Sequence, residues 1–272
     1  MTHISVLTEK RISVSSSYLA VIAIVLSLLS ICLGIPSLAA ILAIPSIIWG
    51  ADTVRRIASY GLGTGVPSIG NLSVSIGILS SLVGLKYSPI LGVLIAAATG
   101  FIFGVIISRL KILKIPHFPR LITELSLAGY LTLTCLVVGV AKTDLLPMVF
   151  NGFLNDDVVK ALFWTGFIAA IYWASTLAIF HPFNAGLGAD ERQGRTLRIA
   201  TVTSGVTICL SGIVRLGNAG ILGRPWMVNE AIIMIAIGGL IWIYGLISLY
   251  NACRREAAST LWTGIPGRGG LE

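Results

Sequence analysis

Side chains that could do chemistry are few in this sequence, and they are scattered. The 272 residues include three histidines, four cysteines and eleven acidic residues. Cys32, Cys135, Cys209 and Cys253 stand singly, without the CxxC or Cys/His spacing of a metal site or a redox pair. We interpret these cysteines as small core residues. We expect no catalytic residue and no bound cofactor on this chain, and the sequence leaves metal binding unknown.

The segment from Ile179 to Ala200, IFHPFNAGLGADERQGRTLRIA, is the densest in polar residues. His181 precedes a proline that ends a helix, and Asn184 can satisfy backbone groups freed there. A single histidine without a second ligand or a proton partner is weak evidence for metal binding or catalysis. Asp190 and Glu191 begin a nine-residue run that also holds three arginines. Such runs are usually solvated loops, but in so charge-poor a chain this run indicates a docking surface.

A second polar segment, TVRRIASYGLGTGVPSIGNLSVS, extends from Thr53 to Ser75. Its glycines free the backbone and Pro67 opens the next helix, which predicts an irregular entry into that helix. The GxGxxG and GxxxxGK[ST] spacings of phosphate loops are missing. Two interpretations stay open: a tight cytoplasmic turn, or exposed backbone groups that line an ion path or a partner surface. The candidate interface or ion-path residues of the two segments are Tyr60, Gly61, Gly63, Gly65, Pro67, Asn71, His181, Asn184, Asp190 and Glu191.

The spacing of the charges identifies the environment of the chain. Charged residues form short clusters, and the run from Ile12 to Gly50 has none. Crossing a bilayer core takes about 20 apolar helical residues. With a mean hydropathy of +0.93 and 56% hydrophobic residues, the chain is predicted to be an all-α, multi-pass protein of the cell membrane. The net charge of +8 is assigned to lysines and arginines that set topology, and not to a nucleic-acid partner.

Eight apolar segments are expected in a polytopic bundle. The first two are separated by only three residues, so they are either two crossings or one re-entrant hairpin. Residues 1–253 are taken as one transmembrane helical domain and residues 254–272 as a short cytoplasmic tail. The segments are approximately Ser15–Leu33, Ser37–Ala51, Val66–Leu85, Tyr87–Ser108, Leu125–Ala141, Ala161–Phe180, Ile199–Val214 and Ala231–Tyr250.

The loops predict an orientation. Alternating spans place about fourteen of the 19 lysines and arginines on the side of the N-terminus, so both termini are expected in the cytoplasm. No charged residue falls at the centre of a predicted segment. Asp52 and Glu124 fall at segment ends, where we expect them to face headgroups or the neighbouring Arg55 and Arg120. If the chain helps to move a cation, it would supply hydroxyls and carbonyls while a partner supplies the carboxylate.

Small residues repeat every four positions in several segments. In lipid, such stripes let helix backbones approach closely. The helices that fill these stripes could belong to this chain or to a partner, and the sequence favours neither. The stripes are Gly92, Ala96, Gly100 and Gly104; Gly166, Ala170, Ala174 and Ala178; and the shorter Ser73, Gly77 and Ser81.

Two stretches, VRRIASYGLGTGVPSIG and HPFNAGLGADERQGRTL, closely resemble the signature stretches of the C subunit of tetrahydromethanopterin S-methyltransferase, an archaeal membrane complex. The length, the order of the spans and the LWTGIP near the end fit as well, so the resemblance extends from about Ser37 onward. The family motif has Cys where this chain has Gly186, and Pro where it has Ala189. These departures argue against an essential thiol at that site.

The resemblance implies an integral membrane subunit of a complex that transfers a methyl group from methyl-tetrahydromethanopterin to coenzyme M and exports sodium ions. It implies that cobalamin and the methyl chemistry belong to partner subunits, while this chain contributes to the membrane part that translocates sodium. The expected partners are other membrane and cytoplasmic subunits, the lipid bilayer and the sodium ion. Two alternatives remain: an independent secondary transporter of a small solute, for which a charged or unwound midplane site would be usual, and a pure assembly scaffold.

Overall fold

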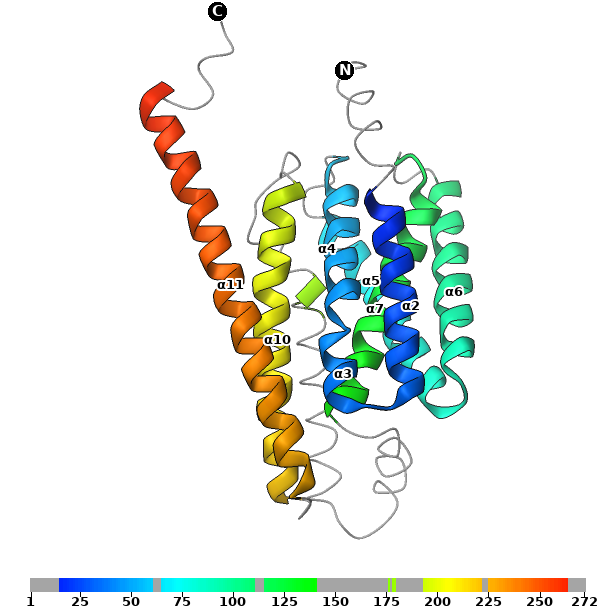
Figure 1. The fold of residues 1–272 in the computed structure, drawn as a ribbon. Helices are drawn as coiled ribbons and strands as arrows, with labels where there is room; N and C mark the ends of the chain where they lie inside the picture. Colours follow the sequence, from blue (N-terminus) through cyan, green and yellow to red (C-terminus); the bar gives the residue numbers. More distant parts are fainter. Residues whose placement is uncertain are drawn as a thin grey trace, which may run out of the picture.

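The computed structural model describes residues 15–60, 65–110, 115–140, 176, 178, 179, 193–221 and 225–263. Throughout these residues every regular element is a helix. The helices lie side by side, and most of their axes are roughly aligned (Figure 1). In chain order they are α2 (Ser15–Leu33), α3 (Pro36–Ile41), α4 (Ile44–Ala58), α5 (Gly65–Lys86), α6 (Pro89–Arg109), α7 (Phe118–Val140), α10 (Gln193–Ile221) and α11 (Trp226–Thr263).

The described helices have the length and composition of membrane spans. Six stretches are long and apolar enough to cross a bilayer, and α2 contributes a shorter apolar helix, Tyr18–Leu33. The predicted class, a helical membrane protein, is confirmed to this extent. The six stretches are Pro36–Ala58, Ser68–Lys86, Pro89–Arg109, Phe118–Val140, Gly194–Gly217 and Trp226–Arg255.

The chain reverses direction between α2 and α3. Gly34 adopts a φ of +63°, in the left-handed region that glycine enters without a steric penalty. Pro36 and Pro45 stand in the first turns of α3 and α4, where the missing amide hydrogen costs no helical bond. As a result, α3 and α4 together run back alongside α2 (Figure 1).

α7 is the central helix. It contacts α2, α3, α4, α5, α6 and α10. Of the residues in its most apolar stretch, 89% are buried. Its neighbours approach closely because they present small residues to it. A Cβ atom added to Gly77 of α5 would lie 2.6 Å from the backbone nitrogen of Tyr130, and one added to Gly104 of α6 would lie 2.5 Å from the Cα of Pro119.

The stripe Gly92, Ala96, Gly100 and Gly104 makes up the buried face of α6. The atoms nearest to its glycines belong to Tyr130, Ser126, Thr123 and Pro119 of α7. The groove along this stripe is therefore filled by a helix of the same chain. Of the second stripe, Ala178 is fully buried in the core, while Gly166, Ala170 and Ala174 lie outside the described residues.

α10 and α11 form an antiparallel pair of their own. Cβ atoms added to Gly205 and Gly238 would lie 2.3 Å from the backbone nitrogen of Trp242 and 2.5 Å from that of Cys209. Gly212 and Gly245 repeat these contacts seven residues further along each helix. The pair packs on the bundle through α10 against α4 and α7 and through α11 against α3. Most of α11 faces outward, since only 17% of the residues in its most apolar stretch are buried.

Four predicted segments were too short. α4 extends to Ala58, beyond the predicted end at Ala51, and α7 begins at Phe118 and contains Glu124. α10 extends on both sides of the predicted Ile199–Val214, and α11 continues without a break to Thr263. The reason is shared: charged side chains lie inside these helices, so boundaries placed at charges cut the helices short. The predicted segment Ala161–Phe180 lies outside the described residues except for residues 176, 178 and 179.

Arginines gather at one end of the bundle, where α4 and α6 end, α7 and α10 begin and α11 ends (Figure 1). We call it the arginine-rich end. Within the described ranges, the basic residues at the opposite end are Lys86 and Arg215. By their positions in these helices, those at or near the arginine-rich end are Arg55, Arg56, Arg109, Arg120, Arg195, Arg198, Arg254 and Arg255.

Candidate functional site

The candidate residues of the first polar segment are only partly described. Tyr60 follows α4 and packs on the core beside it. Gly65 and Pro67 lie in the first turn of α5, and the backbone carbonyl of Asn71 accepts a 2.7 Å hydrogen bond from Ser75 on the exposed side of that helix. The candidates that lie outside the described residues are Gly61, Gly63, His181, Asn184, Asp190 and Glu191.

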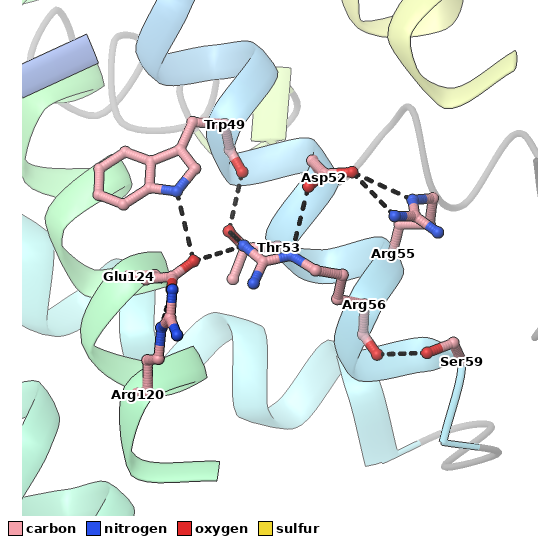
Figure 2. A network of polar contacts seen from close by, with 8 residues as sticks. All are labelled: Trp49, Asp52, Thr53, Arg55, Arg56, Ser59, Arg120 and Glu124. Carbon is pink, nitrogen blue, oxygen red and sulfur yellow. Dashed lines mark hydrogen bonds and ion pairs between the residues drawn. The ribbon is translucent and has the colours of Figure 1, made fainter. Parts of the chain in front are cut away.

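The main polar site of the described bundle is a buried ionic network between α4 and α7, near the arginine-rich end (Figure 2). Its centre is Arg56, which is 2% exposed. One of its terminal nitrogens, Nη2, donates to an oxygen of Glu124 across the helix contact and to the Thr53 hydroxyl at 2.9 Å. Its Nε lies 3.3 Å from Asp52 Oδ2. One cation therefore lies between two buried carboxylates.

Each carboxylate of the network has a second cation. Arg55 holds Asp52 through contacts of 3.0 and 3.2 Å to Oδ1. The Nε of Arg120 donates to Glu124 Oε1 at 2.8 Å. Arg120 itself is largely exposed, whereas Asp52 is 1% exposed. Three arginines and two carboxylates leave this network with one positive charge.

Neutral groups complete the network. The indole nitrogen of Trp49 donates to Glu124 Oε2 at 3.4 Å, and its backbone carbonyl accepts a 2.9 Å bond from the Thr53 hydroxyl. Trp49 and Thr53 are almost fully buried. Because α4 holds Trp49, Asp52, Thr53 and Arg56 at spacings of three and four residues, these side chains lie along one face of the helix. That face meets Glu124 on α7.

The sequence predicted the local ion pairs of this site but not the contacts between α4 and α7. The predicted pairing of Asp52 with Arg55 and of Glu124 with Arg120 is confirmed. Of the two surroundings expected for these carboxylates, headgroups or neighbouring arginines, the structure shows the arginines, and both carboxylates are buried within helices. Arg56 was interpreted only as an orientation signal. Its spacing of four residues from Asp52 on an apolar helix could have predicted the ion pair between them.

A second buried cation lies toward the opposite end. Arg215 of α10 is 0% exposed. It ion-pairs with Glu230 of α11, donates to the carbonyls of Gly139 and Val140 at 3.3 and 3.1 Å, and lies 5.8 Å from the ring centre of Trp226. The carbonyls at a helix C-terminus attract cations. Arg215, expected in a loop, thus joins α7, α10 and α11.

Both networks consist of opposite charges that pair inside an apolar bundle. Among the described residues, no three His, Cys, Asp or Glu side chains gather as ligands for a metal ion. The fold and the polar sites together define an integral membrane protein with an ionically cross-linked helical interior.

Comparison of the amino-acid sequence with known proteins shows the family of the chain. The sequence model of the family described as the C subunit of tetrahydromethanopterin S-methyltransferase matches residues 2–268, and the chain belongs to this family. The C subunit of Methanothermobacter thermautotrophicus is 36% identical over 239 residues, covering 85% of this chain and 82% of that protein. That of Methanosarcina acetivorans is 35% identical over 227 residues (82% and 79%), and that of Methanopyrus kandleri 29% over 243 residues (86% and 82%).

Proposed function

We propose that the chain is a membrane subunit of a complex that transfers a methyl group from methyl-tetrahydromethanopterin to coenzyme M and couples the transfer to sodium export. The observation that carries the proposal is the family match over residues 2–268. The long apolar helices support a role inside the bilayer, because the described residues form no separate soluble domain in which the transfer could occur. Within the complex, the chain contributes to the ion-translocating membrane part.

The proposed orientation has the arginine-rich end and both termini in the cytoplasm. The excess of arginines at this end supports it, because cytoplasmic ends of spans are rich in Lys and Arg. We take α2 and the α3–α4 pair as two separate crossings, because they run in opposite directions (Figure 1) and their 19 and 23 residues are about the length that a crossing needs. With a further span over residues 161–180, the chain crosses about eight times.

The chain does not carry the methyl group in this proposal, and cobalamin sits on a partner protein of the complex. The state of the buried carboxylates supports this division. Asp52 and Glu124 each contact two arginines, so neither can bind a sodium ion without breaking an ion pair. A sodium path along this chain would use hydroxyls and carbonyls.

One observation favours a pure assembly scaffold as the second candidate. Two buried hydroxyls on α7 bond to hydroxyls of neighbouring helices: Thr132 to Ser46 at 3.0 Å, and Thr134 to Ser81 at 2.9 Å. Such pairs hold helices together and leave fewer oxygens for an ion. A scaffold without part in the ion path would affect sodium transport only through assembly.

The test uses the assembled complex in two assays: methyl transfer in detergent, and sodium uptake into inverted vesicles. Replacing His181 by Gln should leave methyl transfer nearly intact because the chemistry lies elsewhere. Reversing Asp190 and Glu191 to Lys should weaken assembly or the coupling of the two activities. Loss of methyl transfer in a fully assembled His181→Gln complex would overturn the noncatalytic assignment.

A further inference from the structure

A groove opens between the first turns of α10 and the last part of α11, on the outer surface of the arginine-rich end. Its volume is about 250 Å³, somewhat smaller than the roughly 300–1,000 Å³ of pockets for drug-sized ligands. It can therefore take a headgroup rather than a whole molecule. The residues that line it include Arg198 from α10 and Tyr244, Ile247, Ser248, Asn251 and Arg255 from α11.

Two cations line this groove, and no counter-ion is described for either. Within the described part of the chain, neither Arg198 nor Arg255 makes an ion pair. The carboxylates whose side chains the structure describes, Asp52, Glu124 and Glu230, are bound to other arginines. Two guanidinium groups facing one cavity repel each other unless an anion lies between them. Their planar donor sets match a phosphate group.

The surroundings indicate where that phosphate comes from. Below the arginines, the outer face of α11 is apolar and exposed, with Leu240, Ile243 and Ile247 at its surface. Tyr244 and Tyr250, both about two-thirds exposed, are residues that favour the boundary between headgroups and acyl chains. A phosphate held at Arg198 and Arg255 would thus have an apolar track beside it for its own chains.

We propose that this groove binds the phosphate headgroup of an anionic membrane lipid. The guanidinium groups of Arg198 and Arg255 hold the phosphate oxygens, and Ser248 and Asn251 supply neutral hydrogen bonds. The hydrocarbon chains of the lipid lie along the outer face of α11. Basic pockets at the ends of transmembrane helices recognise anionic lipids in this way. The proposal is independent of the reaction that the complex performs.

The test is native mass spectrometry of the purified complex, titrated with phosphatidylglycerol or with phosphatidylcholine of the same acyl chains. The variants are Arg198→Gln, Arg255→Gln and the double replacement. The matched control is Arg254→Gln, which removes an exposed arginine next to the groove that does not line it. We expect phosphatidylglycerol to bind more weakly by about fivefold in each single variant and about thirtyfold in the double variant.

Three outcomes would overturn the proposal. The first is equal binding of phosphatidylglycerol to the double variant, or an equal loss in Arg254→Gln. The second is full displacement of the lipid by inorganic phosphate at matched concentration, which would make the groove a site for a free anion. The third is arginine-dependent lipid binding to the isolated chain that is absent from the complex, which would assign the groove to an acidic segment of another subunit.

Discussion

Arg56 is the residue on which the polar interior of the described bundle depends, because it is the one described cation that touches both Asp52 and Glu124. Glutamine in place of Glu124 removes the charge but keeps the shape, so a buried guanidinium loses one of its two counter-charges. Breaking a buried pair in this way costs about 3–5 kcal/mol. The free energy of unfolding in mixed detergent micelles should fall by that amount.

Arg120→Gln is the control for this experiment, since it removes the exposed partner of the same carboxylate. An exposed pair contributes about 0–1 kcal/mol. Equal destabilisation by the two replacements would show that Arg56 is not the principal partner of Glu124.

Local spacing revealed part of this network and long-range packing supplied the rest. The pairs Asp52–Arg56 and Arg120–Glu124 are four residues apart, and this spacing is visible in the sequence. The contacts of Trp49 and Arg56 with Glu124 depend on how α4 is rotated against α7. No local pattern specifies that rotation, so these contacts required the structure.

At the scale of elements, Gly238 and Gly239 are neighbours in α11 in opposite environments. A Cβ atom at Gly238 would meet the α10 backbone at Cys209, whereas one at Gly239 meets nothing within 4 Å. Alanine favours helix over glycine by about 1 kcal/mol. Gly239→Ala should therefore be neutral or stabilising, while Gly238→Ala should separate the two helices and lower the unfolding midpoint in detergent. Similar midpoints for the two variants would contradict the close contact.

The stripe on α6 allows a second paired test. A Cβ atom added to Gly100 would lie 2.9 Å from the Ser126 hydroxyl oxygen and 3.1 Å from the Cα of Thr123, whereas Ala98 is exposed. Gly100→Leu should cost about 1–3 kcal/mol of unfolding free energy through overpacking, and Ala98→Leu should cost little. If only Gly100→Leu released other subunits from the complex without destabilising the chain, a partner helix would be the occupant of this face.

Spacing of four residues predicted the α6 stripe, but the α10–α11 contact follows a different period. Gly205 and Gly212, like Gly238 and Gly245, lie seven residues apart. This spacing belongs to antiparallel helices that cross at a small angle. A search for repeats of seven would have found these glycines, although it would not have paired α10 with α11.

At the scale of the whole molecule, the orientation is open to a direct test. In a chain whose other cysteines are replaced, Cys253 lies exposed near the arginine-rich end, and a cysteine in place of the exposed Tyr87 lies at the opposite end. With a membrane-impermeant maleimide, Cys253 should react only in inverted vesicles. The Tyr87→Cys thiol should react only in right-side-out vesicles, and the reverse pattern would place the arginines outside.

The glycine contacts along α10 and α11 have a mechanical meaning. With backbones in contact at four glycines, neither helix can slide or roll against the other without driving atoms into the opposing main chain. We therefore expect the pair to move as one unit. Its contact with α3, α4 and α7 is less extensive than the contact within it, so we expect a rearrangement of the described bundle to occur where this pair meets those helices. Arg215 of α10 donates to the carbonyls at the end of α7, so it is a side chain that links the pair to the rest of the bundle at this contact.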